Sequence, residues 1–177
     1  MATQEYYVNL ARRILEKLTE GMPAEIKTFW DGEPMVIGTS QLPAVIVDWQ
    51  TTAPVAGGTG LDRWLNTIVI KVVLNKMDDV GVLEVKGGES KIIEVPTQKR
   101  LEQLIFARDG TTGQYLAGSI LGILRTNLSM DSNEVSQNLT IEFGNASRPS
   151  GGETNLVTSE AHITLQAREL IQVPVRT

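Results

Sequence analysis

The side chains that could act on a substrate are few, and they lie far apart in the sequence. His162 is the single histidine and falls among the polar residues of an alternating segment, a position more typical of a solvated or edge histidine than of a catalytic base. One histidine and no cysteine exclude a paired-histidine metal site, a thiolate zinc site and a cysteine nucleophile within one chain. Asp78 and Asp79 are adjacent, so an extended backbone would point them to opposite sides and make them a poor metal pair.

The stretch Gly57-Gly58-Thr59-Gly60 is the segment that most suggests phosphate binding. A phosphate-cradling loop needs a following Lys and Ser or Thr, and it runs from a strand directly into a helix; neither condition is met here. The sequence also contains no G-x-S-x-G elbow that would support a serine nucleophile. We therefore expect a protein that is not an enzyme, with no catalytic, cofactor-binding or metal site.

Composition and charge limit the classes of partner. The 177 residues fit one domain, and 41% apolar with 21% charged residues is ordinary for a globular protein. The 16 basic and 21 acidic side chains give a net charge of −5, which does not favour a nucleic-acid grip built from clustered Lys and Arg. The apolar run Tyr115–Leu124 is about half of the roughly 20 residues that span a bilayer. Arg12 and Arg13 interrupt the N-terminal apolar residues, so we expect no signal peptide and a cytoplasmic location.

Hydrophobic periodicity predicts an amphipathic helix first and three strands after it. Apolar residues recur at spacings of three and four between Tyr7 and Leu18, and Gly21 with Pro23 would end the helix. The Asp31-Gly32 pair after the first strand indicates a hairpin turn. The strands are expected at Glu25–Trp30, Pro43–Thr52 and Arg63–Met77, with a mobile glycine-rich loop at Ala53–Asp62.

The second half of the chain is expected to hold two helices and then two strands. Pro96 would open a helix that ends near Arg108, and a second helix would carry an apolar stripe over Tyr115–Leu124, capped at Thr111 and Gln114. Gly118 and Gly122, four apart, would allow this helix to pack closely on a neighbouring element. The remaining segments are an irregular connection with one short strand at Asp78–Val95, strands at Val135–Phe143 and Leu156–Ile171, and a loop at Gly144–Thr154.

Strands with alternating apolar and polar residues are typical of an antiparallel sheet with one covered face. We therefore predict an α+β fold, in which a mainly antiparallel sheet carries helices packed on one face, in a single domain with long loops. The first helix, the strand Ile68–Leu74, the Tyr115–Leu124 helix and the last strand have the cleanest periodicities and are expected to form the core.

Three tryptophans, Trp30, Trp49 and Trp64, fall on or beside the first three predicted strands. One interpretation places them at the rim of the core, where helix and sheet meet. The other places Trp49 or Trp64 at a contact between subunits, because tryptophan is enriched at interface hot spots. In that case the loop containing Gly57, Gly58 and Gly60 would be a docking arm, since long loops in compact domains are often functional. Both interpretations remain open at this stage.

The order of the segments resembles that of a known family. Lys27-Thr-Phe-Trp-Asp-Gly-Glu-Pro34 contains an F-[aromatic]-D-G-x-P turn, Leu42-Pro-Ala-Val-Ile-Val47 contains an [apolar]-P-A-V-x-V strand, and Leu61-Asp-Arg-Trp64 leads into a long amphipathic strand. A helical middle and the closing strand Ser159–Leu165 follow. This series is similar to that of the tail terminator proteins of long-tailed bacteriophages, in particular the minor tail protein U type. The residue-level likeness is confined to Phe29–Pro34, Leu42–Val47 and Leu61–Leu74.

The resemblance implies a structural protein and one tail-terminator-like domain over residues 1–177, with insertions near 78–95 and 144–154. Such proteins form a ring, expected to be a hexamer, on the head-proximal end of the tail tube, stop tube polymerisation and provide the docking surface for the head connector or stopper protein. The partners implied are further copies of the chain, the tail tube protein, the connector and, in a contractile tail, the sheath protein. DNA would only pass through the lumen, and no membrane would be involved. The location implied is the virion, in the neck region of the tail, after assembly in the host cytoplasm.

Two alternatives remain beside this reading. Another neck component, such as a tail completion or connector-stopper protein, would share the α+β fold and the absence of an active site. A small ligand-binding domain would need convergent polar residues in a pocket, and the sequence offers no candidate set.

Overall fold

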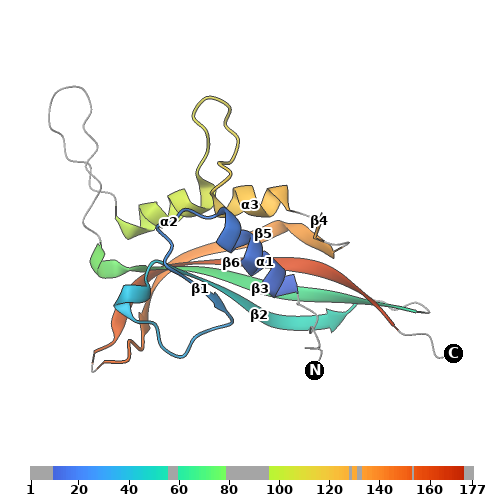
Figure 1. Cartoon of the computed structure of the whole chain (residues 1–177), viewed down its shortest axis with the longest axis horizontal. Coiled ribbons are helices and arrows are strands. Elements are labelled where there is room, and N and C mark those ends of the chain that lie inside the picture. Colours follow the sequence, from blue (N-terminus) through green and yellow to red (C-terminus); the bar gives the residue numbers. More distant parts are fainter. Residues whose placement is uncertain are drawn as a thin grey trace, which may run out of the picture.

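The described residues of the chain form one six-stranded sheet with three α-helices on one face (Figure 1). The computed structural model describes residues 10–55, 60–78, 96–127, 129–130, 133–152 and 154–173. In chain order the elements are α1 (Leu10–Gly21), β1 (Thr28–Asp31), a 3-10 turn at Thr39–Gln41, β2 (Ala44–Pro54), β3 (Leu61–Asn75), a second 3-10 turn at Lys76–Asp78, α2 (Thr97–Phe106), α3 (Ile120–Thr126), β4 (Ser129–Met130), β5 (Asn133–Arg148) and β6 (Leu156–Gln172). The predicted α+β class, with a mostly antiparallel sheet, is confirmed.

The strands lie in the order β1-β2-β3-β6-β5-β4, and every neighbouring pair is antiparallel except β1 with β2. Strands β3 and β6 stay in register without interruption from Leu61 opposite Gln172 to Asn75 opposite Thr158. The parallel β1–β2 pair makes the predicted Asp31-Gly32 hairpin wrong. Parallel strands cannot be joined by a two-residue turn. Gly32 does have the positive φ of 91° that Asp-Gly pairs favour, but it starts a longer connection that leads to Pro43.

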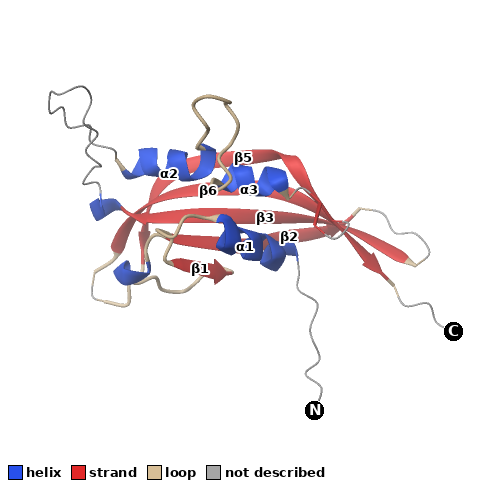
Figure 2. Cartoon of the chain, turned by 45° about the horizontal axis from the view of Figure 1, so that its top comes forward, coloured by secondary structure: helices blue, strands red, loops and turns tan. Residues whose placement is uncertain are grey.

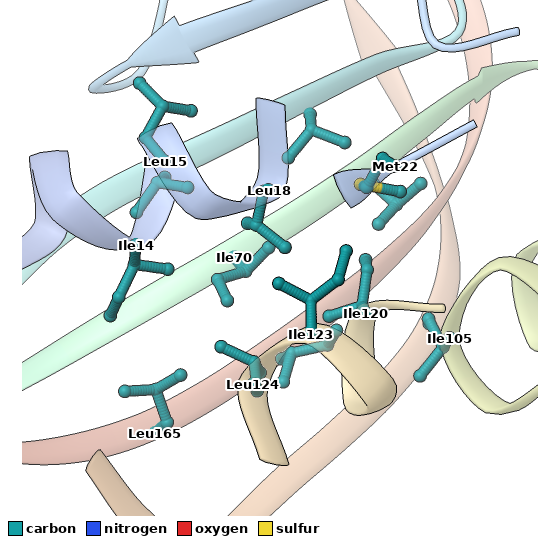
Figure 3. Packing of buried hydrophobic residues seen from close by; sticks show 14 of the residues in the cluster. Ile14, Leu15, Leu18, Met22, Ile70, Ile105, Ile120, Ile123, Leu124 and Leu165 are labelled. Atoms are coloured by element: carbon teal, nitrogen blue, oxygen red, sulfur yellow. The ribbon is translucent and has the colours of Figure 1, made fainter. Parts of the chain in front are cut away.

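The main core lies between the helices and one face of the sheet. The stripe predicted for the first helix is confirmed over the described residues, because Leu10, Ile14 and Leu18 of α1 are all fully buried. They pack with residues of β3, α3 and β6, including Ile70 and Leu165 (Figure 3). On α2, Leu101, Leu104 and Ile105 are buried, and the helix that was predicted to end near Arg108 ends at Phe106.

The second predicted helix begins later than its apolar stripe suggested. Tyr115 lies in an isolated bridge to Arg108 and Leu116 lies before the helix, which begins at Ile120. Its cap is Ser119, whose hydroxyl accepts a hydrogen bond from the Gly122 backbone N–H at 3.1 Å, so the predicted cap at Thr111 and Gln114 is wrong. The stripe misled because Tyr115 packs on the core from an irregular segment, whereas Leu116 is 45% exposed.

Two predicted loops also differ from the structure. Strand β5 runs to Arg148, so Gly144–Arg148 is paired with β6 and only the second half of the predicted Gly144–Thr154 loop connects the strands. Small residues interrupt the alternation of apolar and polar side chains in this part of β5, so the sequence did not indicate a strand there. Strand β2 ends at Pro54 and β3 begins at Leu61, so the predicted Ala53–Asp62 loop is shorter than expected. Apart from Asp78, the predicted Asp78–Val95 connection lies outside the described residues.

The other face of the sheet is partly covered, against the expectation of one covered face. Ala44 and Ile46 of β2 alternate with Val45 and Val47, and the two pairs are buried in separate clusters. The second cluster is completed by Ile37 and Leu42 of the β1–β2 connection, Val73 of β3 and Leu156 of β6. The unbroken run Ala-Val-Ile-Val at the start of β2 is the pattern of a strand buried on both faces.

Candidate functional site

A cluster of charged side chains lies on the sheet face opposite the helices. It brings together Glu33 after β1, Lys71 of β3, Arg148 at the end of β5, and Glu160 and His162 of β6. Adjacent strands in register place residues of one parity side by side, so Lys71 lies opposite His162 in the β3–β6 pair. The charge cluster, defined by these five residues, was not predicted from the sequence, since its members come from four separated segments.

Glu160 is the centre of the charge cluster, and its side chain is 4% exposed. Arg148 binds it with two nitrogens, Nη2 lying 2.9 Å from Oε2 and Nε contacting Oε1. The Thr158 hydroxyl donates to Oε1 at 2.6 Å, and His162 Nε2 lies 2.9 Å from Oε2. Arg148 also binds Glu33, whose second oxygen lies 2.5 Å from Lys71 Nζ. Every oxygen of Glu160 therefore has partners.

These contacts decide the ionisation of the carboxylates. Burial opposes the charge on Glu160, but hydrogen bonds from His162, Arg148 and Thr158, together with the charge of Arg148, hold its pKa well below the ordinary value. Burial acts on Glu33 in the same way, and Arg148 and Lys71 again outweigh it and lower the pKa. The hydrogen bonds that Arg148 donates to Glu160 raise the pKa of Arg148, with burial opposing. The charge cluster thus contains ionised carboxylates whose oxygens accept hydrogen bonds from neighbouring side chains.

Such an arrangement can position segments, because each carboxylate joins side chains from different strands and connections. Glu33 belongs to the connection that covers the second cluster, and its ion pairs with Arg148 and Lys71 attach that connection to β5 and β3. His162 was expected to be a solvated or edge residue. Its side chain is 40% exposed, but it lies on β6 between β3 and β5 and contacts Glu160, so it is not at an edge. Within the described part of the chain, no group of three or more acidic or histidine side chains could hold a metal ion.

Of the residues predicted for a subunit contact, the structure describes Trp49, Trp64 and Gly60. Trp49, on β2 opposite Ile68, is 39% exposed, whereas Trp64 is half-buried on β3, opposite Pro54 of β2 and Glu169 of β6. Gly60 directly precedes β3 and has a φ of 85°. Its carbonyl accepts a hydrogen bond from the Val173 N–H at 3.0 Å. Gly57 and Gly58 lie outside the described residues. Trp30 packs against the second cluster.

Exposed apolar side chains do gather where β2, β3 and β6 extend past the helices (Figure 2). Val55, Leu61 and Leu170 are 54%, 39% and 43% exposed, and Ile171 and Val173 are similarly exposed. We call these five residues the apolar end of the sheet. The sequence signal for it is the pair Leu170-Ile171, which breaks the alternation of the last strand and presents apolar side chains on both of its faces. Contiguous exposed apolar surface often marks an interaction site.

One hollow bears on the alternative of a ligand-binding domain. It has a volume of about 340 Å³ and lies between α2 and the segment before α3, lined in part by Pro23, Leu104 and Leu116. Its two charged residues, Glu25 and Arg100, are bound to each other at 3.1 Å and are therefore occupied. The hollow provides an apolar surface rather than converging polar groups, which is unlike a site that orients a small molecule.

The sheet has uncovered backbone at both sides. Strand β1 pairs with β2 only over Ala44–Val47, and no strand among the described residues covers Asp48–Pro54. On the opposite side, β4 pairs with β5 only at Asn133 and Glu134, so the described strands leave the outer edge of β5 open from Leu139 onward. We call these stretches the β2 edge (Asp48–Pro54) and the β5 edge (Leu139–Gly144 and the residues that follow).

Comparison of the sequence with models of known protein families and with curated proteins finds no match. None of the helices in the described part of the chain is long and apolar enough to cross a membrane.

Proposed function

We propose that the chain is a structural tail terminator of a long-tailed bacteriophage. It forms a ring, with six copies expected, on the head-proximal end of the tail tube, stops polymerisation of the tube and presents the surface to which the head connector docks. The observation that carries the proposal is the ordered series of three motif segments in the sequence, over Phe29–Pro34, Leu42–Val47 and Leu61–Leu74.

The positions of these segments in the fold support treating them as one unit. Phe29–Asp31 lies in β1, Ala44–Val47 begins β2, and Leu61–Leu74 makes up almost all of β3. These three strands are consecutive neighbours in the sheet, so the likeness covers one continuous part of the molecule. Three weak motifs in neighbouring strands support a common fold more strongly than three motifs on unrelated surfaces.

The physical task of a terminator requires surfaces rather than a reaction centre. A growing tube stops when its end is covered by a layer whose outer face does not repeat the tube's own face. A closed ring meets this condition, because each copy offers one face to the tube and a different face to the head. The apolar end of the sheet and the uncovered sheet edges are surfaces of the kind that such an assembly uses.

The proposal is tested by deleting the gene in the phage that encodes it and examining the particles by electron microscopy. We expect heads and tails that remain unjoined, with tubes of abnormal length, and recovery when the gene is supplied in trans. A completion or connector-stopper protein would instead leave unjoined tails of normal length. Joined virions with tails of normal length in the deletion strain would refute the terminator role, whatever oligomer the purified protein forms.

A further inference from the structure

The two uncovered edges of the sheet have features that fit one another. The β5 edge contains no proline or lysine from Leu139 to Arg148, and its first five residues alternate apolar with polar side chains. Long open edges are templates for strand pairing, and proteins that do not use them usually protect them with charges, prolines or short strands. The β2 edge is also long, because β1 stops at the partner of Val47.

The directions of the strands determine how copies could join at these edges. From β2 to β3, from β3 to β6 and from β6 to β5 the chain reverses direction each time, so β5 runs antiparallel to β2. When copies are related by rotation about an axis along the strands, strand directions are kept. The β5 edge of one copy would then lie antiparallel to the β2 edge of the next, which is the commoner pairing in sheets.

Apolar side chains on the helix side of both edges are incompletely covered. Ile141 and Phe143 are half-buried against the main core, and Phe143 lies beside Phe106 with ring centroids 6.5 Å apart. Trp49 is on the same side of the sheet, opposite Ile68, and is 39% exposed. Pairing of the two edges would place Trp49 next to the β5 residues and continue the core from one copy into the next.

Charge distinguishes the two registers that place Trp49 opposite Ile141 or opposite Phe143, the half-buried apolar residues of the β5 edge named above. With Trp49 opposite Ile141, Asp48 would face Glu142, which is an unfavourable like-charge pair. With Trp49 opposite Phe143, Asp48 faces Gly144, which has no side chain. The bulge between Trp49 and Thr51 adds one residue to β2, so Asp48–Pro54 then matches Leu139–Gly144 and keeps each side chain on its own face. Beyond Gly144, β5 would meet the end of β1, where the pairing must stop.

We propose that copies of this chain join in solution by antiparallel pairing of the β5 edge of one copy with the β2 edge of the next, in the register that places Trp49 opposite Phe143. The inference rests on the proposed ring and names its seam. The contact is heterologous, because each copy contributes one edge of each kind, and repeated rotation closes it into a ring. Trp49, but not Trp64, lies at this seam, since Trp64 is on a strand with neighbours on both sides.

The absence of cysteine allows a direct test with introduced thiols. The double variant Asp48→Cys/Gly144→Cys places one thiol on each edge at residues that face each other in the proposed register. A side chain at Gly144 has open space around it, with no atom within 4 Å of a Cβ. Under mild oxidation we expect a ladder of crosslinked oligomers on a non-reducing gel, because the Cα atoms of residues opposed on paired strands are close enough for a disulfide bond.

Three controls accompany the double variant. Asp48→Cys/Glu142→Cys shifts the second thiol by two residues and should crosslink several-fold less. Asp48→Cys and Gly144→Cys alone should remain uncrosslinked. All variants should melt near the temperature of the parent protein. Dimers from Gly144→Cys alone would mean that β5 pairs with itself, and equal crosslinking of the two double variants would mean random encounters; either result overturns the seam.

Failure of the seam can be distinguished from failure of the proposed function. If the purified protein forms rings in electron micrographs while Asp48→Cys/Gly144→Cys stays uncrosslinked, the seam is wrong and the terminator proposal stands on its own test. If the deletion phage makes normal virions while the double variant forms the ladder, the seam is right and the terminator proposal is wrong.

Discussion

At the scale of single residues, the charge cluster is the feature with the largest energetic consequences. Glu160 is a buried carboxylate whose ionised form is held by Arg148, Thr158 and His162. A buried ion pair adds little net stability over an apolar replacement, but removing one partner leaves an uncompensated charge. The charge cluster is therefore expected to be more sensitive to loss of a single member than the exposed ion pairs of α1.

Arg148→Ala should lower the free energy of unfolding by about 3 kcal/mol, because it leaves two ionised carboxylates without their main partner. Urea unfolding followed by circular dichroism measures this change. Lys17→Ala, which removes the exposed pair with Glu20, is the matched control and should cost less than about 1 kcal/mol. Equal effects of the two substitutions would show that the charge cluster does not hold the β1–β2 connection.

The lowered pKa of Glu160 predicts a pH dependence of stability. A carboxylate with a folded-state pKa below its ordinary value of 4.5 stabilises the fold above that value, and the stabilisation is lost as the pH falls toward the folded-state pKa. The parent protein should thus lose melting temperature on acidification more steeply than Glu160→Gln, whose amide does not titrate. Parallel slopes for both proteins in a melting series from neutral pH downward would contradict this.

At the scale of elements, the sequence predicted helices and strands with a local hydrophobic period, and it missed features that depend on contacts between distant segments. The α1 stripe and the strand Ile68–Leu74 follow from 3.6- and 2-residue periods within one segment. Asp31-Gly32 was a hairpin signal, but the partner of β1 is the start of β2 on the far side of a long connection. The charge cluster could not be predicted, because Glu33 and Arg148 meet only after the sheet has formed.

The start of α3 depends on one glycine. A Cβ at Gly122 would lie 2.1 Å from the carbonyl oxygen of Leu116, a backbone atom that cannot move aside without shifting the segment before the helix. Gly122→Ala should therefore cost about 1–3 kcal/mol in unfolding free energy. Gly118→Ala, whose Cβ would lie 3.6 Å from the carbonyl oxygen of Gly21, is the control and should be better tolerated. Thermal melts of both variants compare the two positions.

The core strands make a separate prediction. Ile70 and Leu165 are 0% and 1% exposed and lie on the helix side of β3 and β6. Ile70→Ala or Leu165→Ala should cost about 2–5 kcal/mol, since each leaves a cavity between sheet and helices. Leu170→Ala, on the exposed part of β6, should change stability much less. Denaturant melts in which all three variants unfold at the same midpoint would contradict the assigned burial.

At the scale of the whole molecule, the apolar end of the sheet is exposed surface that the described residues leave uncovered. One interpretation of the sequence placed Trp49 or Trp64 and a glycine-rich loop at a contact between subunits. The structure places Trp64 within the sheet, leaves Trp49 39% exposed, and gathers further exposed apolar side chains at Val55, Leu61 and Leu170. Apart from the Leu170-Ile171 pair, no local pattern distinguishes these residues from core residues, because their exposure results from strands that extend past the helices (Figure 2).

A charge at the apolar end should weaken association without unfolding the chain. Leu170→Lys replaces an exposed residue, so its effect on stability should stay within about 0.5 kcal/mol. If this end contacts tube, connector or another copy, the variant should sediment more slowly than the parent or co-pellet less with assembled tube protein. Glu20→Gln, an exposed change on α1 away from both the apolar end and the β5 edge, provides a control with the same change in net charge. Unchanged sedimentation and co-pelleting of Leu170→Lys would show that the apolar end is not a contact surface.

The position of β6 in the sheet has a consequence for biosynthesis. This strand follows every other described strand in chain order, yet it lies between β3 and β5 and pairs with both along nearly its whole length. While the ribosome is still making it, β3 and β5 have no common neighbour and the main core lacks Ile163 and Leu165. The sheet can then close only by pairing segments that are far apart in the chain, which is a slow step. Nascent chains should consequently expose unpaired strands until β6 has emerged and paired, so this protein is expected to depend on chaperones until that pairing is complete.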